Sequence, residues 1–268
     1  GGPLSLPLSA EEGGRSEKAP CTEPPATIYS LWQRTATREH LLVYWAYSFL
    51  IVSLDESFPL FCLSKASGLA IHEKNIGDIF SGTGFFYITI QYFLLTGLVQ
   101  RFGFYKTLRI GAFCSVPLCV LIPLSLLTNS GAPPGTLHRS TWVLLSVVYA
   151  VVRVFSLLVF STLTMTTNRT VPSQQRGTMQ GLSMLGGSVA KACGPVFSGL
   201  FFSSSVEYFV PPRGSVVVFG TFSCLGVCLA VQTLWLHAPA HSSEAFVEEE
   251  PERGAQDDHE EEDRPPTF

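Results

Sequence analysis

The chain has 268 residues, of which 46% are hydrophobic and 14% are charged, and its formal net charge is −4. These averages conceal a division, because residues 41–236 are a nearly continuous series of apolar blocks between two polar ends. A water-soluble domain does not need apolar runs of this length, and an outer-membrane barrel would need alternating strands of about ten residues, which the sequence lacks. The composition excludes both classes and predicts an all-α membrane protein.

Residues 1–40 are rich in glycine, proline, serine and charged residues. This composition is typical of disordered segments, so we predict a disordered cytoplasmic linker there. The chain begins with Gly-Gly-Pro rather than with methionine, and its first residues contain no apolar signal region. We therefore interpret the chain as a fragment or as the later part of a longer protein.

Six apolar runs follow, each of roughly 20 residues, which is long enough for a helix to cross about 30 Å of hydrocarbon. Helices are expected because a helix bonds all of its backbone groups within its own segment. The predicted transmembrane helices are 41–63, 76–99, 108–127, 141–164, 178–203 and 215–236. Residues 237–268 hold 11 of the 21 acidic residues, and we predict that they form a disordered acidic cytoplasmic tail.

An even number of spans places both termini on one side of the membrane. With the termini in the cytosol, 11 basic residues lie in cytoplasmic segments and four lie on the opposite side, in agreement with the positive-inside rule. The short loops alone give five against four. We therefore predict an integral, multi-pass protein with cytoplasmic termini, in which the sequon Asn168-Arg169-Thr170 faces the cytosol and stays unmodified. The choice between plasma membrane and vacuolar membrane stays open.

Ionisable residues inside the predicted spans cost about 2.5–3.5 kcal/mol each on insertion scales, and four of them stand out. Asp55 and Glu56 belong to the first span, Arg153 to the fourth and Lys191 to the fifth. One interpretation is a polar cavity in which a carboxylate exchanges a proton while the basic groups bind an anionic substrate. The alternative is a structural ion pair, or side chains that extend towards the membrane surface. Gln91 could likewise hydrogen-bond a substrate or simply a neighbouring helix.

Small residues and a proline form a second pattern, in the fifth predicted span. Gly177 and Gly181, and further along Gly187 and Gly194, lie along helix faces and would let neighbouring backbones approach closely. Pro195 removes a backbone hydrogen bond and is expected to kink its helix. The pair Gly194-Pro195 therefore indicates a bending point for gating, with static packing as the alternative.

Motifs for enzyme chemistry are absent from the sequence. It has no Walker sequence, no G-x-S-x-G and no H-E-x-x-H, so the chain is not predicted to be an enzyme or an ATP-driven pump. His237 and His241 lack a third ligand with suitable spacing, and the seven cysteines form no C-x-x-C pair. We therefore expect no metal site, no cofactor and no nucleic-acid partner. No repeated filter-like sequence supports a channel.

The segment VPSQQRGTMQGLSMLGGSVAKACGP, residues 171–195, resembles the eleventh helix and preceding loop of the major facilitator superfamily. More narrowly, it resembles zinc-induced facilitator-like transporters of plants and fungal drug:proton antiporters, in which a V/A-P-x-x-x-R-G turn leads into a glycine-rich helix, a basic residue and Gly-Pro. LDESFPLF and NIGDIFSGTGFFYITIQ are similar to the seventh and eighth helices of these relatives. The resemblance covers about residues 40–236 and implies the C-terminal six-helix half of the fold, built from 3+3 inverted repeats.

The resemblance also implies roles for particular residues. The family places a basic residue at the position of Lys191, and Arg153 matches a basic position of the tenth helix. Arg101 and Gly103 match the R-x-G of a cytoplasmic loop motif, in which Gln100 here replaces an aspartate. Together with the patterns above, these matches assign substrate or proton coupling to Asp55, Glu56, Gln91, Arg153 and Lys191, and gating or packing to Arg101, Gly103, Arg176, Gly177, Gly181, Gly194 and Pro195.

The function implied is secondary transport of a small solute or ion across the lipid bilayer, coupled to protons by antiport. Such a transporter needs a second wall for its cavity, so the expected partner is an N-terminal six-helix half of the same transporter. A non-transporting membrane scaffold or receptor derived from such a half is the alternative. Zinc, a zinc chelate, potassium and organic drugs are all compatible with the resemblance.

Overall fold

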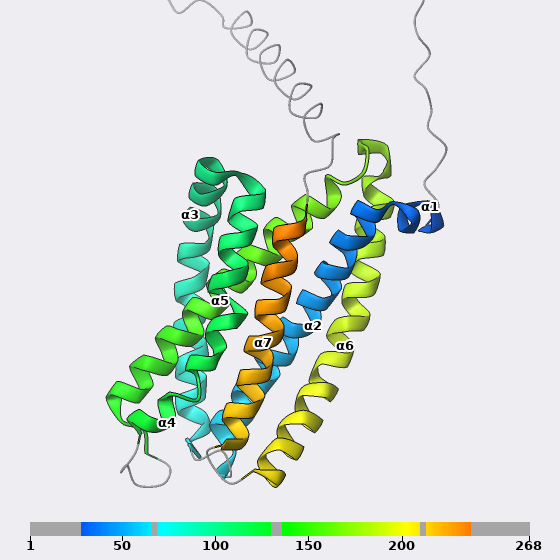
Figure 1. Ribbon diagram of the computed structural model, residues 1–268. Coiled ribbons are helices and arrows are strands. Elements are labelled where there is room, and N and C mark those ends of the chain that lie inside the picture. Colours follow the sequence, from blue (N-terminus) through cyan, green and yellow to red (C-terminus); the bar gives the residue numbers. More distant parts are fainter. Residues whose placement is uncertain (1–27, 66–68, 130–135, 210–212, 237–268) are drawn as a thin grey trace, which may run out of the picture.

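The computed structural model describes residues 28–65, 69–129, 136–209 and 213–236, and within these ranges every regular element is a helix (Figure 1). Residues 1–27 and 237–268, which belong to the predicted linker and tail, lie outside the described residues. The all-α prediction is confirmed. The α-helices are α1 (Ile28–Gln33), α2 (Thr35–Leu63), α3 (Glu73–Cys114), α4 (Ser125–Thr128), α5 (Arg139–Asn168), α6 (Arg176–Tyr208) and α7 (Arg213–Trp235), and the 3₁₀ helices are η2 (Val116–Leu121) and η3 (Ser173–Gln175).

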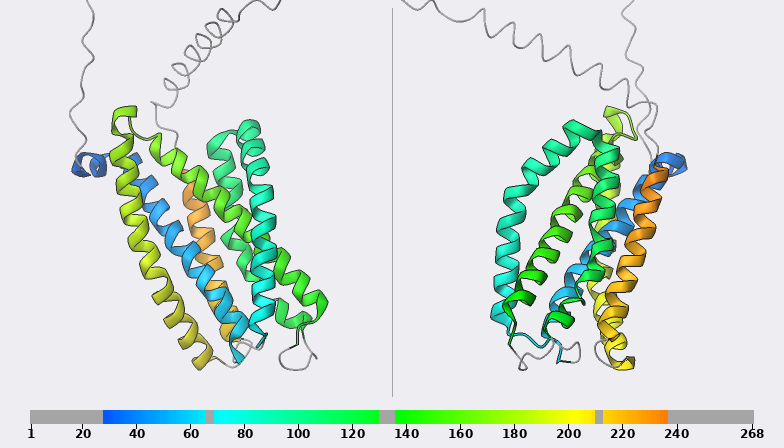
Figure 2. Two further views of the ribbon diagram at one scale, coloured as in Figure 1. Left: turned by 180° about the vertical axis from the view of Figure 1, so that it is seen from behind. Right: turned by 60° about the vertical axis from the view of Figure 1, so that its left-hand side comes forward.

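Five helical segments of the described chain are long and apolar enough to cross a membrane, and one of them consists of two helices joined at a kink. This segment, Glu73–Leu121, contains Gly103 in a non-helical conformation with φ 76° and ψ 169°. Figures 1 and 2 show the chain rising along the first leg of α3 (residues 73–102), turning, and returning along the second leg (residues 104–114). With the two legs of α3 counted separately, the chain runs along the bundle six times. Both ends of the described chain lie at the same end of the bundle as the Gly103 turn (Figures 1 and 2).

The third predicted span needs a correction. We predicted a helix over 108–127, but α3 ends at Cys114 and the chain continues as the 3₁₀ helix η2 and the short helix α4. Pro117 lies in the first turn of η2, and Pro123 lies between η2 and α4. Proline has no N–H to donate and its ring clashes with the preceding turn, so an α-helix cannot run through this segment undisturbed.

The predicted linker also needs a correction, because its last part is helical. Residues 28–40 form α1 and the start of α2 rather than a disordered segment. Leu31 is fully buried in a small cluster with Leu41 and Met179, and the ring of Trp32 stacks on Trp45 with centroids 5.9 Å apart. Burial of these apolar side chains stabilises an ordered helix that the polar average of the segment does not reveal.

The bundle is built from two main helix pairs, α3 with α5 and α2 with α6, and α7 packs against η2 and α6. Stacked rings join α2 to α5, since the centroids of Phe58 and Tyr149 are 4.1 Å apart and Phe80 of α3 meets both rings edge-on. Large apolar side chains also cover the outside, for example Phe85, which is 78% exposed. Such a surface is suited to lipid or to a second helical half.

The glycines of α6 fall into two groups. Gly187 and Gly194 face α2, where an added Cβ would lie 3.1 Å from the ring of Tyr44 and 3.0 Å from Val52 respectively. Gly177 and Gly181 have no atom of the described chain within 4 Å of that position, so the close approach expected for them is absent here. At Gly194-Pro195 α6 continues through the proline as one helix, and the role of this pair as a bending point stays a prediction.

Candidate functional site

An ion pair joins α2 to α5 near the middle of the bundle. One guanidinium nitrogen of Arg153, Nη1, donates to Oδ2 of Asp55, and the two side chains are 34% and 29% exposed. Within the described ranges this is the only salt bridge. The stacked rings explain its position, because Phe58 lies about one turn after Asp55 and Tyr149 about one turn before Arg153. Packing of these rings brings the two charged side chains into reach.

The position of Asp55 and Arg153 within membrane-length helices favours an ion pair over two separate charges. An ionised group without a partner at membrane depth is costly, and removal of one member of a buried pair leaves the other charge uncompensated. Arg153 uses one of its five N–H donors on Asp55. The guanidinium therefore keeps donors with which it can bind a second anionic or polar group.

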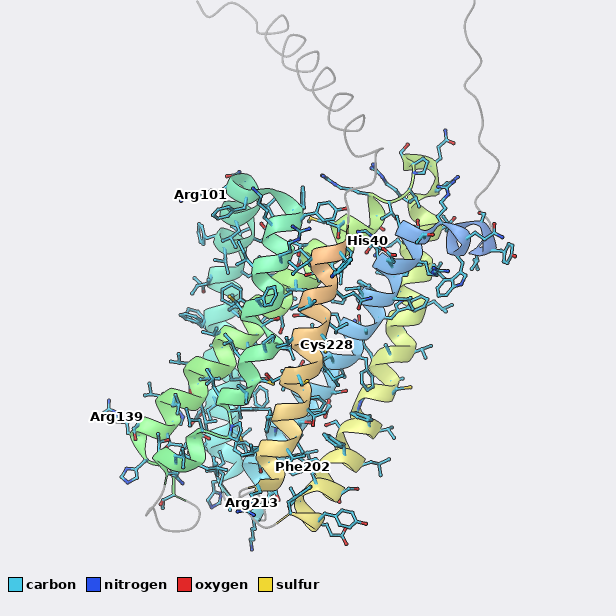
Figure 3. The ribbon with its side chains drawn as sticks, in the orientation of Figure 1. His40, Arg101, Arg139, Phe202, Arg213 and Cys228 are labelled. Atoms are coloured by element: carbon cyan, nitrogen blue, oxygen red, sulfur yellow. The ribbon has the colours of Figure 1, made fainter. Side chains whose placement is uncertain are left out.

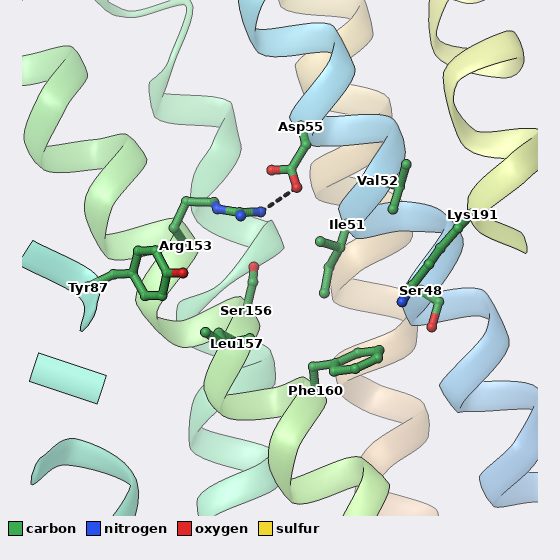
Figure 4. A pocket seen from close by; sticks show the side chains of 10 residues that line it. All are labelled: Ser48, Ile51, Val52, Asp55, Tyr87, Arg153, Ser156, Leu157, Phe160 and Lys191. Carbon is green, nitrogen blue, oxygen red and sulfur yellow. Dashed lines mark hydrogen bonds and ion pairs between the residues drawn. The ribbon is translucent and has the colours of Figure 1, made fainter. Parts of the chain in front are cut away.

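A cavity of about 300 Å³ lies beside the ion pair (Figure 4). Its lining comes from four helices: Ser48, Ile51, Val52 and Asp55 of α2, Tyr87 of α3, Arg153, Ser156, Leu157 and Phe160 of α5, and Lys191 of α6. On α2 and on α5 the lining residues follow the same spacing of i, i+3, i+4 and i+7, so each helix presents one continuous face to the cavity. We call this space the inner cavity.

A second cavity of about 400 Å³ lies on the other side of the ion pair, and we call it the outer cavity. Its lining is Asp55, Glu56, Pro59, Phe80, Thr83, Gly84, Tyr87, Tyr149 and Arg153. Asp55, Tyr87 and Arg153 therefore line both spaces. The ion pair lies where the two cavities meet, whereas Glu56 is exposed and lines only the outer one.

Lys191 reaches the inner cavity from α6. Its Nζ lies 4.9 Å from the ring centroid of Phe160, and Figure 4 shows the side chain extending towards Ser48. No acidic side chain of the described chain forms a salt bridge with it. Lys191 is thus held by a cation–π contact rather than by a counter-charge.

Comparison with known protein families gives a match over most of the chain. The family model of the Major Facilitator Superfamily covers residues 39–265. The chain belongs to the major facilitator superfamily. Family membership identifies it as an integral, multi-pass membrane protein of a transporter family rather than an enzyme.

Two curated relatives are distant in sequence. One is named a probable peptide/nitrate transporter, from Arabidopsis thaliana, and is 26% identical over 193 residues, which are 71% of this chain and 37% of that protein. The other is named a major facilitator superfamily multidrug transporter, from Aspergillus fumigatus, and is 23% identical over 211 residues, or 74% and 33% of the two chains. The chain thus spans about a third of the length of these relatives. No solved structure matches it.

The structure of this superfamily member brings together three of the five residues that the sequence assigned to coupling. Asp55, Arg153 and Lys191 line the inner cavity, and Glu56 lies next to them in the outer cavity. Gln91 lines neither cavity, and its buried Oε1 has no hydrogen-bond partner among the described residues. A neighbouring-helix bond, the alternative for Gln91, is therefore not formed within the described chain either.

Three of the residues assigned to gating, Arg101, Gly103 and Arg176, line neither cavity and lie at one end of the bundle (Figure 1). Gly103 forms the turn of α3, and its φ of 76° with ψ of 169° is a conformation open essentially to glycine alone. Arg101 is exposed beside this turn, with its guanidinium carbon 5.7 Å from the ring centroid of Phe102. Arg176 begins α6 at the same end of the bundle and is exposed. Their roles in gating stay predictions.

Sequence reasoning missed the uncharged residues of the inner cavity. Tyr87, Ser48, Ser156 and Phe160 are common types in membrane helices, so composition alone does not mark them. A signal does exist in the spacing, because Ser48 lies seven positions before Asp55 and Phe160 lies seven positions after Arg153, on the same helix faces. Among the described residues, no group of three His, Cys, Asp or Glu side chains is placed to hold a metal.

Proposed function

We propose that the chain forms one wall of the solute cavity in a proton-coupled secondary transporter, and that Asp55 is the group that carries the proton. The observation that carries this proposal is the position of the Asp55–Arg153 pair between the inner and outer cavities. A titratable pair at such a position can respond to a proton and at the same time alter the connection between two compartments.

Protonation of Asp55 would remove the charge that holds Arg153. The guanidinium would then turn towards another acceptor, either the solute or a group of the opposite helical half. Because Arg153 and Tyr87 line both cavities, this movement changes the boundary that they share. Release of the proton would restore the pair, so each protonation state favours a different connection between the cavities.

Glu56 is the weaker candidate for the proton carrier. It is exposed, lines one cavity, and forms no salt bridge within the described chain. Its protonation would leave the pair between Asp55 and Arg153 intact. Between the two carboxylates that the sequence offered, the geometry therefore favours Asp55.

The second wall of the cavity would come from an N-terminal six-helix half. The relatives are about three times as long as the matched segment, and the outer surface of α3 and α6 carries exposed apolar side chains such as Phe85 and Leu200. Substrate sites of these folds lie between two halves, near the middle of the membrane. The chain alone is therefore expected to bind but not to transport.

The distribution of charge supports cytoplasmic termini. Among the described residues, the end of the bundle with the Gly103 turn carries seven basic side chains and one acidic one, whereas the opposite end carries four basic and three acidic ones. Figure 3 shows Arg101 at the first end, and Arg139 and Arg213 at the other. By the positive-inside rule, the Gly103 end faces the cytosol and the inner cavity opens towards it.

Proton movement in proteoliposomes tests the proposed function. The complete protein, the chain together with its N-terminal half, is reconstituted with a pH-sensitive dye in the lumen and an acidic exterior. We then add nitrate, dialanine, ethidium or 4-toluenesulfonate. At least one solute is expected to cause saturable proton movement that protein-free liposomes and the 268-residue chain alone do not show. No saturable response to any of them, or an equal response from the chain alone, would contradict the proposal.

A further inference from the structure

The charges of the inner cavity identify a class of solute. We infer that this cavity binds a small organic anion with an apolar body, and that Lys191 binds its anionic group, which is a carboxylate or a sulfonate. The inference rests on the proposed function, because it names the solute of the same cavity. It goes further in stating which solutes the cavity accepts and which it rejects.

The first argument is the balance of charge. Three ionised side chains line the inner cavity, and Arg153 neutralises Asp55, so Lys191 supplies a net charge of +1. An ammonium group at membrane depth without a counter-charge is unfavourable, and no acidic partner exists for it in the described chain. An anionic solute would provide that partner, whereas a cationic solute would be repelled.

The second argument is the way in which Lys191 is held. Its Nζ contacts the face of Phe160 at 4.9 Å, and the ring of Phe160 is fixed in turn by Tyr44, with centroids 5.1 Å apart. A cation–π contact leaves the three N–H donors of an ammonium group free to bond elsewhere. Lys191 is therefore positioned in the cavity and able to donate charge-assisted hydrogen bonds to an anion.

The third argument is the apolar part of the lining. Ile51 of α2 lies opposite Leu157 and Phe160 of α5, and Val52 lies on the side of α2 that faces α6 (Figure 4). These walls would bury the hydrocarbon body of a solute, and a volume of about 300 Å³ is at the lower limit of sites for small organic molecules. A compound with one ring suits this space better than nitrate, which has no apolar surface to bury.

Tyr87 offers a further polar contact. Its side chain lines the cavity from α3, and its hydroxyl has no hydrogen-bond partner among the residues that the structure describes. The hydroxyl of Ser48, in contrast, already donates to the backbone carbonyl of Tyr44 at 2.8 Å. We therefore expect Tyr87 to donate to the solute and Ser48 to remain bonded within its helix.

The sign of the charge also predicts the direction of coupling. A proton on Asp55 frees Arg153, which raises the positive charge available in the cavity and favours an anion. Proton and solute would then move in the same direction, in contrast to the antiport that the family resemblance implied. Cotransport thus follows from the charges of this cavity together with the proposed role of Asp55 as the proton carrier.

A matched set of ligands tests the inference by direct binding. The complete protein in lipid nanodiscs is titrated with 4-toluenesulfonate, 4-toluenesulfonamide, 4-methylbenzylammonium and nitrate, and binding is measured by calorimetry. The four probes separate the charge from the apolar body. Only toluenesulfonate is expected to bind with measurable affinity. Equal binding of the amide, of the ammonium compound or of nitrate would overturn the inference.

Variants of Lys191 provide the second arm of the test. Lys191→Met is expected to weaken toluenesulfonate binding about 10- to 100-fold, because a charge-assisted hydrogen bond is lost. Lys191→Arg is expected to retain most of the affinity, and Lys106→Met, an exposed lysine on the second leg of α3, is expected to match the parent protein. Unchanged affinity in Lys191→Met, or loss in Lys191→Arg equal to that in Lys191→Met, would contradict the assignment.

Binding and transport can fail separately. Lys191-dependent binding of toluenesulfonate without any proton movement would leave the anion site intact and remove the proposed function. Proton-coupled movement of a cation or a neutral solute, without binding of toluenesulfonate, would leave the proposed function intact and remove the anion site.

Discussion

Asp55 of α2 and Arg153 of α5 form an ion pair across 98 positions of the chain, at the boundary between two cavities. The pair depends on helix packing, because Phe58 and Tyr149 stack about one turn away from the two charged residues. A double-mutant cycle measures its contribution to stability. Asp55→Asn and Arg153→Gln are each expected to lower the free energy of unfolding by about 1–3 kcal/mol, since each leaves one charge unpaired.

The double variant decides between a pair and two independent residues. If the charges interact, Asp55→Asn with Arg153→Gln should cost less than the sum of the two single changes, because no unpaired charge remains. Unfolding in detergent, followed by helical circular dichroism, gives all four values. Strict additivity would show that the two side chains do not stabilise each other.

The turn at Gly103 predicts a position where glycine is needed. Because φ is 76° and ψ is 169° there, Gly103→Ala is expected to destabilise the protein by about 1–3 kcal/mol. Gly97→Ala is the matched control, because Gly97 lies in the helical first leg of α3. No atom of the described chain lies within 4 Å of a Cβ added there. The control should be neutral or slightly stabilising. Thermal unfolding in detergent would show the difference, and equal effects of the two changes would argue against a special turn.

The contact between α2 and α6 predicts a second sensitive glycine. An added Cβ at Gly186 would lie 2.1 Å from the ring of Trp45, which donates its Nε1–H to the carbonyl of Ser183 at 3.2 Å. Gly186→Ala should therefore displace the indole, cost about 1–3 kcal/mol and alter the tryptophan fluorescence. Gly199→Ala, on the same helix with no atom within 4 Å, should do neither. An unchanged emission spectrum in Gly186→Ala would mean that α2 and α6 are not packed in this way.

The orientation of the chain predicts the fate of its sequon. Asn168 ends α5 at the same end of the bundle as the Gly103 turn, and its side-chain amide donates to Gln180 at 2.8 Å. If this end faces the cytosol, Asn168 carries no glycan in cells, and Asn168→Gln leaves the electrophoretic mobility unchanged. An epitope tag after Phe268 should be stained only in permeabilised cells. A mobility shift on glycosidase treatment that Asn168→Gln abolishes would show that this end of the bundle does not face the cytosol.

Charge made the centre of the site predictable from the sequence. Asp55, Arg153 and Lys191 are conspicuous because ionisable residues are costly within apolar runs, so their types and positions alone indicate a cavity or an ion pair. The sequence did not show that Asp55, rather than Glu56, pairs with Arg153. That choice depends on which helix face meets α5, and the stacking of Phe58 on Tyr149 determines it.

Pattern alone was less informative for the backbone. Close approach was expected at four glycines, and Gly187 and Gly194 do contact α2, as does Gly186, whereas at Gly177 and Gly181 an added Cβ would contact nothing in the described chain. Residues 28–40 look polar on average, but a few buried apolar side chains are enough to order them. In both cases the result depends on which residues lie opposite in the folded bundle, and local composition does not contain that information.

Solute-coupled proton movement in the Asp55→Asn variant tests the central claim most directly. Proteoliposomes of the complete protein receive a gradient of 4-toluenesulfonate, a permanently charged anion, and a luminal dye reports the pH. We expect the parent protein and Glu56→Gln to move protons with the solute. Asp55→Asn should exchange labelled toluenesulfonate without a change in luminal pH. The assignment of Asp55 as the proton carrier would be contradicted if Asp55→Asn moved as many protons per solute as the parent protein. It would also be contradicted if only Glu56→Gln lost proton movement.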